Sequence, residues 1–136
     1  MLIEGTKVRA IDYIHSIHIT KEIRKEFLSL LRHRIDIIIV PTTIIPAPRL
    51  NEESVIVNKD FLISIREALL RNTIIFNSIG LPSISIPIGL TKKDHLPVGL
   101  QVIGPPNGDK LVLSVAHQFE STNTEVYKST PPLGDI

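Results

Sequence analysis

The chain has 136 residues, of which 43% are hydrophobic and 21% are charged, as in an ordinary single globular domain, so wholesale disorder is excluded. Fifteen basic and fourteen acidic residues leave a net charge of +1, which gives no reason to expect nucleic acid or an anionic membrane as a partner. The absence of cysteine excludes a disulfide framework and a thiol nucleophile. No apolar run reaches about 18 residues and no signal peptide is recognisable, so we expect a cytoplasmic protein.

The first predicted element is helical and covers Lys7–Arg34. Ile23, Phe27 and Leu30 recur at helical spacing, with charged residues mostly between them. Thr20 is a suitable N-cap residue, so the pattern permits either two helices or one long helix.

A wholly apolar run, Ile35–Val40, follows and predicts a strand covered on both faces. The segment Pro41–Asn58 contains three prolines and few regular signals, and it predicts a long loop at the end of that strand. In open α/β sheets, ligands gather at such strand ends.

A second helix is predicted over Asp60–Ile79, with Asp60 as its N-cap. Gly80 supplies the residue type that ends helices, and Pro82 prevents continuation.

Two further strands are predicted over Ser83–Ile88 and Pro97–Gly104, joined by the polar turn Gly89–Leu96. A third helix is expected from Asp109, and residues 121–136 are expected to form an irregular tail. Residues 1–136 are therefore interpreted as a single α/β domain, a small mixed sheet of about three strands covered by about three helices.

The residues that could carry chemistry are few. No G-x-S-x-G elbow or phosphate-binding glycine loop is present, and Ser83 and Ser85 are interpreted as small strand residues facing a helix. His15 and His18 have no third ligand at a metal-binding spacing, so no metal site is predicted. Arg71 could form a buried ion pair with Asp12 or Glu67, or contact a substrate carboxylate. The pair Glu52–Glu53 is interpreted as solvated.

Three segments in a fixed order carry a resemblance: IDIIIVPTTIIPAP, RNTIIFNSIGLPSISIPIG and LPVGLQVIGPPNGDKLVLSVAHQFE. This order resembles the C-terminal third of the amidase signature family, over about residues 5–120. The matching positions are Asp36, Pro41, Thr42, Ala47, Pro48, Asn77, Gly80, Pro82, Pro87, Gly89, Pro97, Gly99, Gln101, Gly104, Phe119 and Glu120.

The resemblance implies a partial amidase-signature fold and an amide hydrolase that uses a Ser–cis-Ser–Lys triad without cofactor or metal. The family's triad lies in the preceding two-thirds of a full-length chain, and nothing here matches its glycine- and serine-rich loop. No catalytic residue can therefore be assigned. The acidic residue of the amidotransferase glutaminase subunits falls at Leu70, so the chain resembles the general amidases more closely.

The resemblance also implies substrate-pocket candidates on two segments. They are Thr42, Thr43, Pro46, Asn77, Gly80 and Leu81. The alternative is structural: Asn77 would bind backbone near the helix end, and Gln101 would pair within the sheet.

We expect the chain to be inactive alone and to contribute sheet and pocket wall if a separate chain carrying the N-terminal amidase segment supplies the triad. The alternative is a non-catalytic scaffold or truncated-gene relic that self-associates as a homo-oligomer, because removal of the rest of the fold would bare apolar surface. No nucleic acid and no membrane is expected as a partner.

Overall fold

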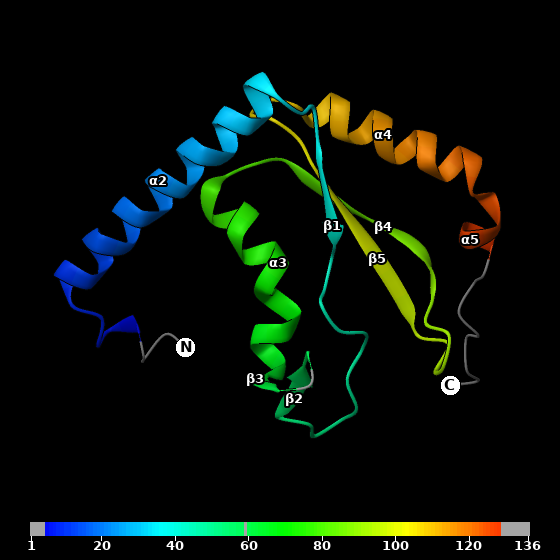
Figure 1. Cartoon of the computed structure of the whole chain (residues 1–136), viewed down its shortest axis with the longest axis horizontal. Helices are drawn as coiled ribbons and strands as arrows, with labels where there is room; N and C mark the ends of the chain where they lie inside the picture. Colours follow the sequence, from blue (N-terminus) through cyan, green and yellow to red (C-terminus); the bar gives the residue numbers. More distant parts are fainter. Residues whose placement is uncertain (1–4, 59, 129–136) are drawn as a thin grey trace.

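The computed structural model describes residues 5–58 and 60–128 and shows three long helices, one short helix and five strands within them (Figure 1). The elements are α2 (Ala10–His33), β1 (Ile38–Pro41), β2 (Ser54–Val57), β3 (Phe61–Ser64), α3 (Ile65–Ile79), β4 (Ser83–Leu90), β5 (Pro97–Ile103), α4 (Asp109–Thr122) and α5 (Thr124–Lys128). None of the described helices is both long and apolar enough to cross a membrane.

The main sheet has three strands in the order β1–β5–β4, which confirms the predicted α/β class and the pairing of the two C-terminal strands. Both pairings are antiparallel, so within the described residues the sheet is not mixed in strand direction. The short polar turn between β4 and β5 makes this hairpin direction the natural one. A register shift between Pro87 and Gly89 marks a bulge in β4.

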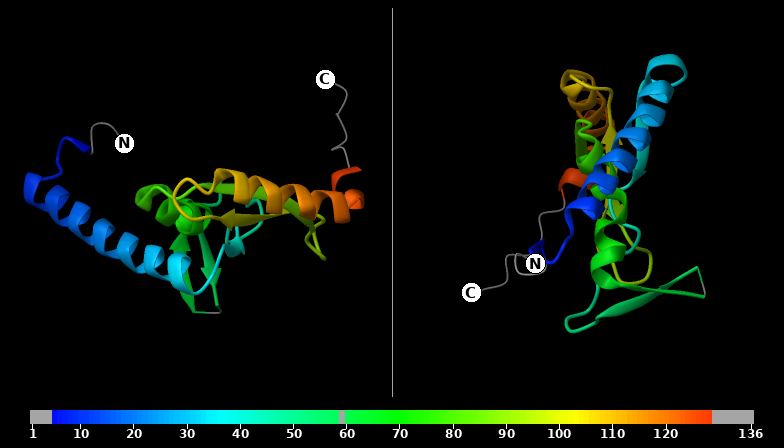
Figure 2. Two further views of the ribbon diagram at one scale, coloured as in Figure 1. Left: turned by 90° about the horizontal axis from the view of Figure 1, so that it is seen from above. Right: turned by 90° about the vertical axis from the view of Figure 1, so that its left-hand side faces the viewer.

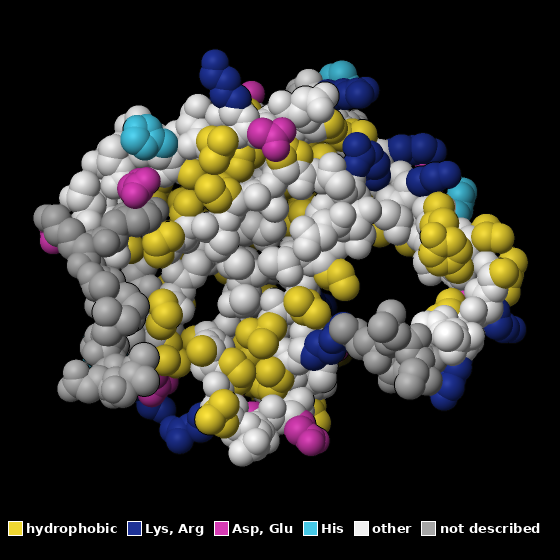
Figure 3. Space-filling model, turned by 180° about the vertical axis from the view of Figure 1, so that it is seen from behind, with side chains coloured by type: hydrophobic (Ala, Val, Ile, Leu, Met, Phe, Trp, Pro, Cys, Tyr) yellow, Lys and Arg dark blue, Asp and Glu magenta, His cyan; other side chains and the backbone are white. Residues whose placement is uncertain are grey.

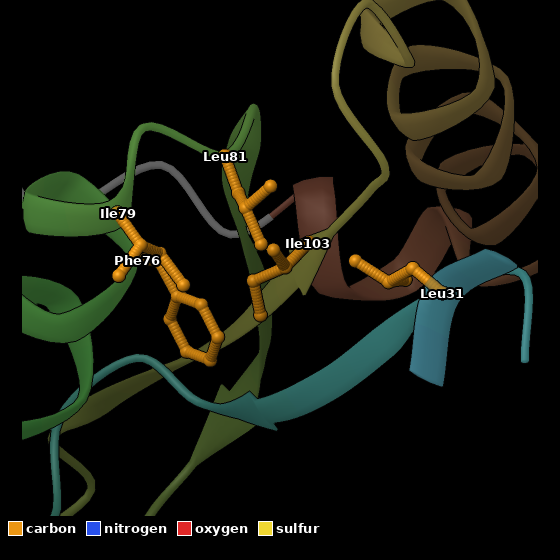
Figure 4. Close-up of a cluster of buried hydrophobic side chains, with 5 residues drawn as sticks. All are labelled: Leu31, Phe76, Ile79, Leu81 and Ile103. Atoms are coloured by element: carbon orange, nitrogen blue, oxygen red, sulfur yellow. The ribbon is translucent and has the colours of Figure 1, made fainter. Parts of the chain in front are cut away.

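Alternate residues of β5 feed two hydrophobic clusters, because successive strand side chains point to opposite faces. Ile103 is fully buried against Leu31 of α2 and against Phe76, Ile79 and Leu81 at the end of α3 (Figure 4). Its neighbour Val102, 1% exposed, packs with Ile86, Val112 and Ala116 under α4. The helices α2 and α3 thus cover one face of the sheet, and α4 covers the other.

The long helix α2 is a single helix through Thr20, so the one-helix alternative holds. Its C-terminal part joins the core through Phe27 and Leu31, and the ring of Phe27 meets Phe76 edge to face at 5.5 Å. Its N-terminal part extends away from the sheet (Figures 1 and 2). Ile11 and Ile14 in that part are each more than 60% exposed.

The predicted helix over Asp60–Ile79 begins five residues too early. The Ser64 hydroxyl accepts the Glu67 backbone N–H at 3.1 Å, so Ser64, and not Asp60, is the N-cap of α3. Residues 61–64 form β3 and pair with β2, which the loop prediction for Pro41–Asn58 missed. The helical period through Leu62 also fits a two-residue alternation, and β-sheet pairing decided between the two.

The end of α3 is confirmed. Gly80 adopts a left-handed backbone with φ 64° and ψ 47°, and its N–H bonds the Phe76 and Asn77 carbonyls. The first strand is shorter than predicted and is not covered on both faces, since Ile39 is 51% exposed. The predicted irregular tail is helical to Lys128, and the rest of it lies outside the described residues.

Candidate functional site

A pair of hydroxyl groups closes the end of the main sheet. The backbone N–H of Thr42 continues the ladder by donating to the Gly99 carbonyl at 2.9 Å, and its hydroxyl bonds the Ser85 hydroxyl at 2.5 Å. A Cβ on Gly99 would lie 2.9 Å from both hydroxyl oxygens. Glycine at this position is therefore what lets the two hydroxyls meet across β5. Ser83 and Ser85 are strand residues as predicted, but both are exposed and do not face a helix.

Gln101 is the buried polar side chain of this sheet, with 3% exposed. Its Nε2 donates to the Ser83 hydroxyl at 3.2 Å, which confirms the predicted pairing within the sheet. Its Oε1 is buried and has no hydrogen-bond partner in the described part of the chain. An unpaired buried acceptor is costly, so this amide is held in place by the surrounding fold.

The largest hollow lies between the β2–β3 hairpin and α3. Its volume is about 700 Å³. Its lining residues are Ile44, Val57, Asn58, Asp60, Phe61, Ile63, Arg71 and Asn72. The Asn72 Nδ2 donates to the Pro41 carbonyl at 2.7 Å, which ties the middle of α3 to the end of β1.

Arg71 does not form the predicted buried ion pair. Its Nη1 lies 3.5 Å from the Glu67 carboxylate, and about half of each side chain is exposed. Asp12 pairs instead with Arg9 at 2.8 Å, and these hydrogen bonds lower the pKa of Asp12. The exposed Arg71 guanidinium faces the hollow beside Asn72 and is available to an anionic group.

Pro46 lies in a second hollow of about 440 Å³. It shares that wall with Pro48, Val55, Ile65 and Leu96. The other two candidates on the same loop are held locally. Thr42 bonds Ser85, and the Thr43 hydroxyl donates to the Ile45 carbonyl at 2.6 Å.

The remaining candidates lie at the far end of α3. Leu81 is a core residue, 6% exposed, and Gly80 faces α2, where the Arg24 Nη1 donates to its carbonyl at 3.3 Å. The Asn77 side chain is exposed and makes no hydrogen bond within the described residues, so the expected backbone contact is wrong. Asn72, one helical turn earlier, makes the backbone contact instead.

The six candidates thus occupy three separate places and line no common hollow in the described part of the chain. The residues that do gather around one hollow, such as Asp60, Phe61 and Asn72, were not predicted. The alternation of apolar residues in Ser54–Val57 was the available signal, because a hairpin there brings Asp60 and Phe61 to α3. Within residues 5–58 and 60–128, no three His, Asp or Glu side chains gather as a metal site requires.

The comparison with known proteins agrees with this architecture. The family model described as Amidase matches residues 2–113. The chain is 35% identical over 111 residues to a fatty acid amide hydrolase of Medicago truncatula, covering 82% of this chain and 18% of the relative. It is 34% identical over 121 residues to the A-type subunit of the glutamyl-tRNA(Gln) amidotransferase of Carboxydothermus hydrogenoformans, covering 89% and 23%.

A solved amidase structure matches with a TM-score of 0.79 at 30% identity, over 89% of this chain and 27% of that one. The chain therefore spans between about a fifth and a quarter of the length of the proteins it matches. The family match covers most of the sequence, and the three-dimensional match covers most of the fold described above. The chain belongs to the amidase family.

Proposed function

We propose that this chain is the C-terminal part of a carbon–nitrogen hydrolase that acts on carboxamides. In this proposal it contributes part of the sheet and one wall of the substrate pocket, and a partner chain supplies the Ser–cis-Ser–Lys triad. The observation that carries the proposal is the partial coverage of its relatives, 18% of one and 27% of another, with the fold of that part retained. The cytoplasmic location expected from the sequence belongs to the same proposal.

The contacts of the strand serines support a role without a nucleophile. A serine attacks an amide only when a base takes its proton and preformed donors stabilise the oxyanion. The Ser85 hydroxyl is paired with Thr42, and the Ser83 hydroxyl accepts from Gln101. Neither partner is a base, and in the described part of the chain no serine hydroxyl hydrogen-bonds a lysine. The reaction itself needs no metal or cofactor.

The pocket wall in this proposal is the loop after β1 together with the end of α3, which hold the six candidate residues. Thr42 and Thr43 offer hydroxyl groups, while Pro46 and Leu81 offer apolar surface. Such a wall suits orientation of an amide beside an apolar group. Leu70 stands where the amidotransferase subunits carry an acidic residue, which supports a general amidase over a glutaminase.

Co-expression tests this proposal. The partner to use is the neighbouring upstream reading frame, if it encodes a lysine followed by a glycine- and serine-rich loop. The expected result is a soluble complex that releases ammonia from simple carboxamides, with neither polypeptide active by itself. A soluble complex without amide hydrolysis contradicts the proposal. The absence of such a frame favours the alternative function.

The alternative is a self-associating, non-catalytic module. It is favoured by the many exposed large hydrophobic side chains, among them Ile14, Ile56, Phe61 and Leu62, each more than 60% exposed. Sedimentation of the isolated chain tests it. A concentration-dependent oligomer supports the alternative, and a clean monomer that binds no hydrophobic dye contradicts it.

A further inference from the structure

One long apolar depression crosses α3 and α2 and is not used by the candidate site. Three adjoining hollows form it, because the middle one shares Ile74 and Ile75 with one neighbour and Thr20, Ser78 and Ile79 with the other. We call this continuous depression the α2–α3 trough. Its main apolar residues are Ile17, Ile23, Leu70, Ile74, Ile75 and Ile79.

The trough is open to solvent along its length. Ile74 is 52% exposed and Ile75 is 40% exposed, although both lie on a helix whose other face is packed into the core. Ile17 and Ile23 on the α2 side are each 37% exposed. Space-filling shows the hydrophobic side chains left bare along α2 (Figure 3). An apolar strip of this kind on a globular domain marks an interaction surface.

The floor of the trough selects the secondary structure of its occupant. It is built from side chains of two helices, whose backbone groups are already hydrogen-bonded within each helix. A strand or irregular segment laid there would bury its own N–H and C=O groups without partners, at considerable cost. A helix satisfies its backbone internally and needs only an apolar face, so a helix is the segment that fits.

The rim of the trough selects the charge of that helix. Four basic side chains and a single carboxylate lie along it. They are Lys21, Arg24, Arg66, Arg71 and Glu67. Within residues 5–58 and 60–128, the ion pair of this rim is the exposed contact of Arg71 with Glu67 at 3.5 Å. The basic groups lie toward the two ends, so carboxylates flanking an apolar face complement them.

The same charges disfavour a second copy of this chain. A two-fold dimer through the trough would set one rim against an identical rim, and four basic groups would face four. Like-charge juxtaposition of this kind opposes association. A lipid surface is disfavoured for a different reason, because a flat bilayer does not enter a concave depression between two helices.

We propose that the α2–α3 trough binds an amphipathic helix with carboxylates at both ends, contributed by the polypeptide that completes the amidase fold. This inference rests on the proposed function and names the surface by which the partner docks. It places docking on α2 and α3, on the opposite side of the sheet from α4.

A peptide pair tests the charge and shape together. The probe is a labelled synthetic peptide of about 18 residues with leucines at helical spacing and glutamates at both ends, and lysines replace the glutamates in its control. Fluorescence anisotropy with the whole chain is expected to show the acidic peptide binding at least about tenfold more tightly, with the difference shrinking as salt rises. Equal affinity for the two peptides, or no binding of either, overturns the proposal.

Variants locate the binding. Ile74→Glu is expected to weaken the acidic peptide by at least about tenfold, because it puts a carboxylate into the apolar face. Leu113→Glu is the matched control, since Leu113 is 58% exposed and lies on α4. Circular dichroism checks that both variants fold. Equal effects of the two substitutions would mean that the peptide binds elsewhere and would overturn the proposal.

The other occupants are tested with the same variant. Sedimentation that shows a dimer abolished by Ile74→Glu would assign the trough to a second copy. Flotation with phosphatidylserine–phosphatidylcholine vesicles, lost in the same variant, would assign it to lipid. Either result overturns the proposal. If a co-expressed pair hydrolyses amides and Ile74→Glu neither weakens the complex nor lowers the rate, the trough inference fails while the proposed function stands.

Discussion

The two sides of the main sheet differ in how completely they are covered. The α4 side is a compact sandwich in which Val102 and Val112 are 3% exposed or less. The α2–α3 side is buried only where the helices meet at Leu31 and Phe76, and it leaves Ile14 and Ile74 more than half exposed. Residues of one chemical kind therefore serve as core on one side and as open surface on the other. The difference teaches that the chain completes one layer of its fold and leaves the second unfinished.

The largest effect expected from a substitution is at the centre of the sheet. Ile103→Ala should lower the free energy of unfolding by about 2–5 kcal/mol, because Ile103 is fully buried and its removal leaves a cavity. Ile39→Ala is the matched control on β1, where the side chain is 51% exposed, and should cost about 1 kcal/mol or less. Urea unfolding measures both, and similar costs would erase the contrast between buried and open isoleucines.

The next effect comes from the close packing of α4 on the sheet. A Cβ on Gly104 would lie 2.6 Å from the Val112 Cγ2, so Gly104→Ala should destabilise the chain by about 1–3 kcal/mol. In a Val112→Ala background the added cost should shrink, since the clashing methyl group is gone. A full double-mutant cycle by urea unfolding checks this. Strict additivity would show that the two sites are not in contact.

A smaller effect is expected at the start of α3. Ser64→Ala removes the hydroxyl that accepts the Glu67 N–H at 3.1 Å, and it should cost about 1 kcal/mol. Asp60→Ala should cost less than about 0.5 kcal/mol if Asp60 does not cap this helix. Thermal unfolding of the two variants separates the observed N-cap from the one predicted from sequence.

The smallest change in stability is expected on the open side. Ile14→Ser should alter the free energy of unfolding by less than about 0.5 kcal/mol, because the side chain is 61% exposed. The same substitution should reduce binding of a hydrophobic dye. A large loss of stability would mean that the N-terminal half of α2 is packed, contrary to the contrast drawn here.

Much of the fold could be predicted because local signals and packing agree. The glycine at position 80 ends α3 where a left-handed residue is needed, and the alternation in β4 and β5 marks their pairing. The hairpin at residues 54–64 could not be predicted in the same way. Leu62 and Ile65 satisfy a helical period as well as a strand period, and the pairing of β2 with β3 decides between them.

The candidate site was less predictable from the sequence. Motif order identified the family, but it could not place Asn72 against the Pro41 carbonyl, since that contact joins residues 31 positions apart. Exposure was predictable only in outline. The run Ile35–Val40 is apolar throughout, as in a strand covered on both faces, yet Ile39 is open in this chain. An apolar pattern reports what a surface is suited to contact, and the contact itself depends on which other segments are present.

The most direct test of the central claim is an ammonia-release assay with the purified chain and simple carboxamides. The account predicts no release above the buffer blank at any protein concentration. Release that is proportional to the amount of this chain, and that survives further purification, would show a complete catalytic apparatus within these 136 residues and would contradict the account.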